Sequence, residues 1–280
     1  MNNFLARTVT GLWIVLIILG SILIHPASFI LLGLIMVVGS LHEYYRLISL
    51  QGIKSQHLTG LLSGAFLYLV SVAHAMQMVS AKIYLMFLLF PLFILIIELF
   101  RKKNNPFQSV AQTFTGVIYT TIPFSLFPFM AFGRGGMHSF ISSPAVEYTP
   151  AVILGFFLLL WINDTGAYLT GITIGKTRLF ERISPKKTWE GFFGGLLLTI
   201  VAAWFLSGWL GVVERIDWLI LALLISTGGT LGDLVESMLK RASGVKDSGH
   251  ILPGHGGFLD RFDGLLVAFP LLFLYITLFG

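Results

Sequence analysis

Four carboxylates near the end of the chain have the residue types and spacing that metal chemistry would need. Asp233 is followed three residues later by Glu236, and Asp260 is followed three residues later by Asp263. On a helix, residues three apart share one face. Because carboxylates so close together repel one another, a hard divalent cation with oxygen ligands is the usual reason for such an arrangement. We therefore expect a cation site here, for which Mg²⁺ is the best fit.

A fifth carboxylate, Asp164, lies in a mainly apolar segment, as does Asp233. A charged side chain within a membrane span costs a few kcal/mol on insertion scales, so such a residue is a functional candidate by default. The structural alternative is that each carboxylate lies at the membrane interface or pairs with a basic neighbour. For Asp233, Lys240 is two helical turns away and could be that neighbour.

A basic segment between two apolar stretches has the features of an anion site. Ser184 followed by Pro185 is typical of an N-cap and a first helical position, which predicts that a helix begins here. Lys186 and Lys187 would then lie in the first turn, where cations are normally disfavoured. The arrangement makes sense if the lysines and the free N–H groups bind phosphate, whereas the alternative is an ordinary cytoplasmic flank. Glu190 could ligate a metal or hold Lys186.

The segment between the last two apolar stretches is rich in glycine. Gly254, Gly256 and Gly257 would let the backbone approach a ligand closely. His255 could be a ligand or an acid–base group, although a lone histidine in a loop is more often neither. The chain has no cysteine, which excludes a thiol nucleophile and, with no clustered histidines, disfavours zinc.

The elements that position these residues are expected to be membrane-spanning helices. The chain is 56% hydrophobic and only 11% charged, whereas soluble domains carry about 25% charged residues. Backbone groups in lipid need internal partners, and no strand-like alternation is visible, so we predict an all-α polytopic membrane protein with about nine transmembrane helices. The nine apolar segments are 9–25, 27–43, 58–77, 83–100, 108–133, 150–170, 190–211, 217–238 and 262–279.

The placement of basic residues predicts the orientation. With the N-terminus in the cytoplasm, all but three of the 18 Lys and Arg residues fall on the cytoplasmic side, and the C-terminus lies outside. The exceptions are Lys82, Arg134 and Arg215. This distribution explains the net charge of +5 without a nucleic-acid partner. We expect an N-terminal region of about five spans over 1–149 and a catalytic region of about four spans with cytoplasmic loops over 150–280, in a bacterial inner membrane.

The residues from Ser237 to Asp263 closely resemble the signature of the CDP-diacylglycerol synthases (phosphatidate cytidylyltransferases). The pattern is Ser-x-x-Lys-Arg, then Lys-Asp, then Pro-x-His-Gly-Gly-x-x-Asp-Arg-x-Asp, and every position is filled. The segments that begin at Asp164 and Ser184 are also similar to members of the family. The resemblance implies a membrane enzyme that converts CTP and phosphatidic acid to CDP-diacylglycerol and pyrophosphate, and it leaves a homodimer open.

The resemblance also gives roles to the candidate residues. Mg²⁺ would be held by Asp233 and Asp260, with a second cation left open, and the triphosphate by Lys186 and Lys187. The expected catalytic residues are Asp233, Asp260, Lys186, Lys187 and Asp164, and the expected metal ligands are Asp233, Asp260 and Asp263. The expected substrate-binding residues are Ser184, Lys186, Lys187, Thr188, Glu190, Lys240, Arg241, Lys246, His255 and Arg261.

Two other classes of function are compatible with a multi-span chain that has carboxylates in its apolar segments. A polyprenol kinase or an ether-lipid cytidylyltransferase would share the lipid-phosphate chemistry, but should not carry the full motif. A secondary transporter would use intramembrane acids as ion sites, but it predicts paired interrupted helices in matching halves. The acids here gather in one half of the chain, and no repeat is visible.

Overall fold

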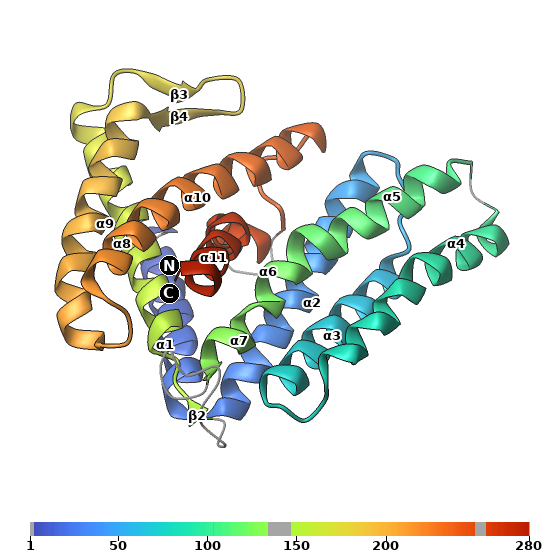
Figure 1. Cartoon of the computed structure of the whole chain (residues 1–280). Coiled ribbons are helices and arrows are strands. Elements are labelled where there is room, and N and C mark those ends of the chain that lie inside the picture. Colours follow the sequence, from blue (N-terminus) through green and yellow to red (C-terminus); the bar gives the residue numbers. More distant parts are fainter. Residues whose placement is uncertain (1–2, 103, 134–146, 250–255, 280) are drawn as a thin grey trace. The chain divides into compact units, whose positions relative to one another are not determined.

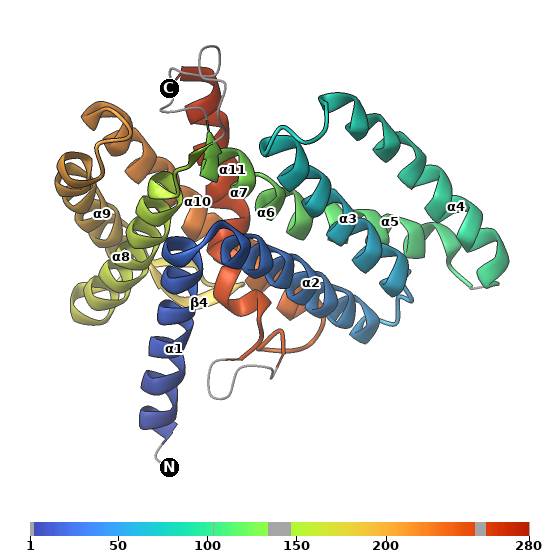
Figure 2. The same cartoon turned by 90° about the horizontal axis from the view of Figure 1, so that it is seen from below.

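Long helices make up most of the computed structural model, which describes residues 3–102, 104–133, 147–249 and 256–279 (Figures 1 and 2). The first half contains α1 (Asn3–Ile24), α2 (Pro26–Leu50), α3 (His57–Ala75), the 3₁₀ helix η1 (Ala81–Leu88), α4 (Leu89–Arg101), α5 (Pro106–Gly116), the π-helical turn η2 (Val117–Thr121), α6 (Ile122–Ser125) and α7 (Phe127–Ala131). The second half contains α8 (Ala151–Ile174), α9 (Trp189–Leu210), α10 (Arg215–Ala242) and α11 (Leu259–Phe279). Two short antiparallel strand pairs join β1 (Phe132–Gly133) to β2 (Glu147–Tyr148) and β3 (Arg178–Phe180) to β4 (Ser184–Thr188).

The predicted membrane helices are present. Among the described residues, eight helical segments are long and apolar enough to cross a bilayer, and a shorter apolar helix, Val9–Ile24, accounts for the first expected span. The eight are Pro26–Leu50, His57–Ala75, Ala81–Arg101, Pro106–Ala131, Ala151–Ile174, Trp189–Leu210, Arg215–Ala242 and Leu259–Phe279. The all-α polytopic prediction is confirmed, because a run of about 20 apolar residues in lipid can satisfy its backbone groups only within a helix.

The chain divides into two compact units, each of which is described by itself. Unit 1 contains Met1–Phe129 and Leu239–Arg261, and unit 2 contains Met130–Met238 and Phe262–Gly280. The segment Leu239–Arg261 therefore packs with helices of the N-terminal half, although it carries much of the motif that the sequence assigns to the C-terminal region.

In unit 1, glycines on neighbouring helices make room for a tyrosine ring. Tyr45 of α2 is 1% exposed, and its hydroxyl donates a hydrogen bond to the carbonyl oxygen of Thr113 on α5 at 2.8 Å. A Cβ atom at Gly60 on α3, or at Gly116 on α5, would overlap the Tyr45 ring. Because lipid tails are as apolar as the side chains, this close packing, rather than hydrophobic burial, holds such helices together.

In unit 2, small residues let α8 approach α9, and α10 approach α11. A Cβ atom at Gly195 of α9 would lie 2.8 Å from the carbonyl oxygen of Asn163 on α8. A Cβ atom at Gly228 of α10 would lie 2.6 Å from the Cα atom of Ala268 on α11. Backbone atoms cannot rotate aside as a flexible side chain can. These glycines therefore fix the spacing of the helices that carry the candidate residues.

The substitution Gly228→Ala is expected to lower the melting temperature of the detergent-purified protein, because its new methyl group meets the backbone of α11. Overpacking of this kind costs about 1–3 kcal/mol. Gly208→Ala in α9 is the matched control, since a Cβ atom there meets nothing within 4 Å. Alanine favours helix, so the control should keep or raise the melting temperature. Equal melting temperatures for the two variants would contradict the packing.

Candidate active site

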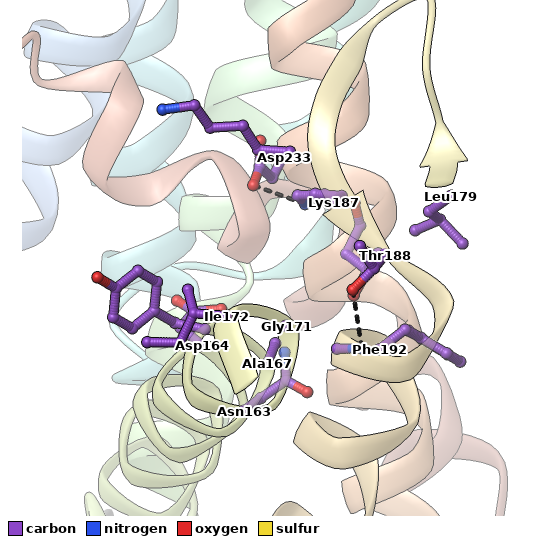
Figure 3. A pocket seen from close by; sticks show the side chains of 14 residues that line it. Asn163, Asp164, Ala167, Gly171, Ile172, Leu179, Lys187, Thr188, Phe192 and Asp233 are labelled. Atoms are coloured by element: carbon purple, nitrogen blue, oxygen red, sulfur yellow. Dashed lines mark hydrogen bonds and ion pairs between the residues drawn. The ribbon is translucent and has the colours of Figure 1, made fainter. Parts of the chain in front are cut away.

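A cavity of about 530 Å³ lies in unit 2 among α8, β4, the start of α9 and α10 (Figure 3). Its polar lining includes Asp164, Lys186, Lys187, Thr188 and Asp233, all of which are candidates from the sequence. Much of the remaining lining is apolar or glycine. The fold thus gathers residues from three separate stretches of sequence around one space, where carboxylates and ammonium groups meet an apolar wall.

The segment before α9 is a strand, and the prediction that a helix begins at Ser184 and Pro185 is wrong. Strand β4, which contains both residues, pairs with β3 in an antiparallel hairpin (Figure 1). The N-cap of α9 is Thr188, whose hydroxyl accepts a hydrogen bond from the N–H group of Gly191 at 3.1 Å. Proline suits an edge strand as well as a first helical turn, and the pairing with β3 decides between the two.

Lys186 and Lys187 therefore lie on extended backbone rather than in the first turn of a helix. Lys187 reaches α10, where its Nζ atom lies 2.6 Å from Oδ2 of Asp233 (Figure 3) and donates to the carbonyl oxygen of Thr230 at 3.4 Å. Lys186 is exposed and lines the same cavity. A hairpin rather than a helix terminus thus presents the basic residues to the candidate carboxylate.

The ion pair of Asp233 is partly open to solvent. The side chains of Lys187 and Asp233 are 24% and 38% exposed. The other carboxylate oxygen of Asp233, Oδ1, accepts a hydrogen bond from the hydroxyl of Ser237 at 3.2 Å. Ion pairs at such exposure contribute only about 0–1 kcal/mol, so a more strongly charged ligand could displace the lysine.

Asp164 and its neighbour Asn163 both line the cavity from α8. Asp164 is exposed, whereas Asn163 is 2% exposed. Sequence reasoning missed Asn163, although the signal was available. A polar amide in the middle of an apolar span is costly for the same reason as a charge, and it marks a place where polar groups meet.

Two other charged candidates hold turns of the backbone. Glu190, in the first turn of α9, accepts hydrogen bonds from the N–H groups of Lys176 and Thr177 at 3.1 Å. Arg241, in the last turn of α10, donates to the carbonyl oxygen of Val245 at 3.2 Å. Both contacts fix the entry to or the exit from a helix that carries candidate residues.

In unit 1, Asp260 is nearly buried and surrounded by donors. Its Oδ1 atom lies 2.6 Å from Nζ of Lys240, and the two side chains are 7% and 11% exposed. Its Oδ2 atom accepts hydrogen bonds from the N–H groups of Ser248 at 2.9 Å and Gly257 at 2.7 Å. The hydroxyl of Ser248 also lies 3.1 Å from Oδ2. The carboxylate of Asp260 is therefore held in one orientation.

Sequence reasoning missed a buried glutamate, Glu43, in the C-terminal half of α2. Its side chain is fully buried, and its Oε2 atom accepts hydrogen bonds from the hydroxyl of Ser248 at 2.6 Å and the N–H group of Leu259 at 2.7 Å. The sequence predicts that a ligand approaches Gly257 closely. In the structure, the groups next to Gly257 are Glu43 and Ser248, and a Cβ atom at this glycine would overlap both. Glu43 is the last residue of the apolar segment 27–43, so the rule that singled out Asp164, a charge inside an apolar span, did not single out Glu43.

The remaining candidates are described more briefly. Lys246 and Arg261 are exposed. Asp263, in the first turns of α11, accepts a hydrogen bond from the N–H group of Gly264 at 2.6 Å. His255 lies outside the described residues.

The carboxylates expected to hold Mg²⁺ are divided between the units, with Asp233 and Asp263 in unit 2 and Asp260 in unit 1. Within the described ranges, no three His, Asp or Glu side chains form a metal-binding group. Asp233 and Asp260 each hold a lysine ammonium group at 2.6 Å. Both Asp233 and Asp260 therefore have carboxylate oxygens beside a positive charge, and Mg²⁺ prefers oxygen ligands of this kind. Each carboxylate is thus of the donor type that Mg²⁺ uses, since this ion commonly takes only one or two protein carboxylates and completes its shell with water and substrate phosphates.

Comparison with known proteins places the chain in a family. It matches the Cytidylyltransferase family over residues 5–279. A phosphatidate cytidylyltransferase of Staphylococcus haemolyticus is 35% identical over 269 residues, which cover 95% of this chain and 96% of the relative. Phosphatidate cytidylyltransferases of Staphylococcus epidermidis and Staphylococcus aureus are 44% and 42% identical over 176 and 181 residues, each covering 58% of this chain and 66% of the relative. Because the family match extends over almost the whole chain, this protein belongs to the cytidylyltransferase family.

Proposed function

We propose that this chain transfers the cytidylyl group of CTP to phosphatidic acid, giving CDP-diacylglycerol and pyrophosphate. The observation that carries the proposal is the cavity of unit 2, where Lys187 and Asp233 form an ion pair beside the exposed Lys186. The names of the relatives agree with this reaction. The cavity combines groups for a polyanion with an apolar wall, as a nucleotide and a lipid together require.

The chemical step needs little more than positioning. A phosphate oxygen of phosphatidic acid attacks the α-phosphorus of CTP, a new P–O bond forms, and the bond to the β-phosphate breaks so that pyrophosphate leaves. A phosphate monoester has a second pKa of about 6, so the nucleophile is largely ionised at pH 7 and needs no strong base. The barrier lies in bringing anions together, which orientation and fixed positive charge reduce.

The lysines of β4 are assigned to the triphosphate. Lys186 is exposed on the cavity and is free to reach a polyanion, whereas Lys187 would exchange Asp233 for a phosphate oxygen. The Asp233 carboxylate would then be available to Mg²⁺, which when bound supplies charge neutralisation at the phosphates. Asp260 and Asp263 are proposed, each within its own unit, as further carboxylates for Mg²⁺ or its water shell.

The lipid is assigned to the α8 side of the cavity. Tyr168 and Ile172 line it from α8 and are 66% and 63% exposed. Apolar side chains that remain exposed in a membrane protein are suited to contact with acyl chains. We place this end of unit 2 at the cytoplasmic surface, where CTP is available, with the N-terminus on the same side and the C-terminus outside, as the distribution of basic residues predicts.

The first test is pyrophosphate release by the detergent-purified protein. Release is expected only when CTP, phosphatidic acid and Mg²⁺ are all present, and omission of any one should abolish it. An unsaturated ether-lipid phosphate, offered in place of phosphatidic acid, tests the related cytidylyltransferase by pyrophosphate release. Dolichol tests the polyprenol kinase by release of CDP, because phosphoryl transfer from CTP leaves CDP. Preference for either of these lipids would overturn the choice of phosphatidic acid. No release with any lipid, from protein that remains folded, would overturn the enzymatic proposal.

The substitution Asp233→Asn is expected to lower turnover about 100-fold or more, because removal of one strong electrostatic group from such a site typically costs that much. Circular dichroism and gel filtration should show the variant folded, since the ion pair that it loses is partly exposed. Asp217→Asn is the matched control on the same helix, where Asp217 accepts a hydrogen bond from Tyr275 at 2.7 Å. The control should keep a turnover near that of the unchanged protein. More than a tenth of normal turnover in Asp233→Asn would remove Asp233 from the metal site.

A further inference from the structure

The buried carboxylate of Glu43 connects α2 to the segment that carries Asp260. Glu43 is 0% exposed. Its Oε2 atom accepts a hydrogen bond from the hydroxyl of Ser248 at 2.6 Å and another from the N–H group of Leu259 at 2.7 Å. Ser248 contacts Asp260 through both its N–H group and its hydroxyl, and Leu259 is the residue immediately before Asp260. Glu43 is therefore one contact away from Asp260 along two separate routes.

We propose that Glu43 is a positioning residue for Asp260. It fixes Ser248 on one side of the Asp260 carboxylate and the first residue of α11 on the other, so that Oδ2 stays among its donors and Oδ1 stays directed at a cation. In the structure that cation is the ammonium group of Lys240, at 2.6 Å. The catalytic meaning of this arrangement rests on the proposed function, in which Asp260 serves the metal.

The backbone around Glu43 is shaped to admit its carboxylate. A Cβ atom at Gly249 would overlap Oε1 of Glu43, and a Cβ atom at Gly257 would overlap both Oε2 and the Ser248 hydroxyl. Gly256 has a φ of +83°, a backbone conformation that residues other than glycine rarely adopt. Gly249 and Gly257 therefore border the Glu43 carboxylate, whereas a Cβ atom at Gly256 would lie nearest to Oδ2 of Asp260, at 2.7 Å. This fit indicates that Gly249 and Gly257 pack with Glu43 as one unit of structure.

A second buried carboxylate in unit 1 shows what a purely structural glutamate looks like. Glu98 of α4 is 5% exposed, and its Oε2 atom receives Arg101 at 2.8 Å, Ser109 at 3.0 Å and Gln56 at 2.6 Å. These partners lie on α4, on α5 and just before α3. Glu43 instead receives donors from the segment that carries the expected catalytic carboxylate. The two glutamates are thus similarly buried, but only Glu43 is hydrogen-bonded to the segment that carries Asp260.

Small displacements of a catalytic group are costly, because a shift of about 1 Å can lower a rate about 100-fold. Loss of Glu43 would leave the Leu259 N–H group without its acceptor, and the Ser248 hydroxyl with only Oδ2 of Asp260, at 3.1 Å. Asp260 would then keep its own donors, but those donors would no longer be held in place. The expected result is a folded protein with a poorly fixed Asp260.

Hydrogen–deuterium exchange of the detergent-purified protein tests this directly. In Glu43→Ala, exchange is expected to rise at least tenfold in the peptides that contain Ser248 and Leu259, and to remain unchanged in peptides of α8 and α9. Glu43→Gln keeps an acceptor oxygen of nearly the same shape, and should restore exchange to within about threefold of the unchanged protein. The matched control is Glu98→Ala, which removes a buried carboxylate elsewhere in unit 1 and should leave exchange in these peptides unchanged.

Kinetics provide the second measurement. In Glu43→Ala, the Mg²⁺ concentration for half-maximal turnover should rise at least tenfold, while KM for CTP changes less than threefold. Glu43→Gln should recover most of this loss, which a merely structural defect would not allow. If Glu43→Ala does not fold, Ser248→Ala removes the hydroxyl between the two carboxylates and should shift exchange and Mg²⁺ dependence in the same direction.

Unchanged exchange in Glu43→Ala would overturn the proposal. So would faster exchange with unchanged Mg²⁺ dependence in an enzyme that turns over, since the contacts would then be structural only. If the unchanged protein releases no pyrophosphate, the proposed function fails. The exchange measurement would still decide whether Glu43 fixes the segment that carries Asp260.

Discussion

A carboxylate within the apolar interior of a helical membrane protein needs donors on every side, because water cannot supply them there. Several of the acidic residues discussed above meet this requirement in part, although Oε1 of Glu43 and Oε1 of Glu98 are buried without a hydrogen bond among the described residues. Asp233 forms an ion pair with Lys187 of the β3–β4 hairpin, and Glu98 forms one with Arg101. Asp260 pairs with Lys240 and also accepts hydrogen bonds from two backbone N–H groups. Loops and helix ends supply these donors, and in the proposed function Lys187 is the one that exchanges its carboxylate for a substrate phosphate.

The membrane helices could be predicted from the sequence because their cause is local. A run of about 20 apolar residues has few alternatives to a helix in lipid, so the nine expected segments coincide with helical segments among the described residues. The same reasoning singled out Asp164 and Asp233, which line the cavity with Lys186 and Lys187. Charge in an apolar context is a local signal and needs no knowledge of neighbours.

The failures have a non-local cause. By local rules, Ser184 and Pro185 fit the start of a helix as well as they fit an edge strand. Only the pairing of β4 with β3 selects the strand. Glu43 was not recognised because its partners, Ser248 and Leu259, lie more than two hundred residues away in the sequence. The glycines at 249 and 257 were interpretable as room for a ligand until the structure placed Glu43 against them. Local patterns therefore selected residues that the fold brings together around the cavity, but not the contacts that hold other candidates in place.

The length of α10 affects the position of this helix in the lipid bilayer. The helix has 28 residues and is therefore about 42 Å long, whereas the hydrocarbon core of a bilayer is about 30 Å thick. It must either tilt or extend beyond the acyl chains by about two turns. Asp233 lies nine residues before the end of α10, within about 14 Å of it along the axis. The depth of this carboxylate relative to the lipid phosphates thus follows from membrane thickness. The lipid composition of the bilayer, which sets its thickness, therefore helps to set the depth of the active site below the lipid headgroups.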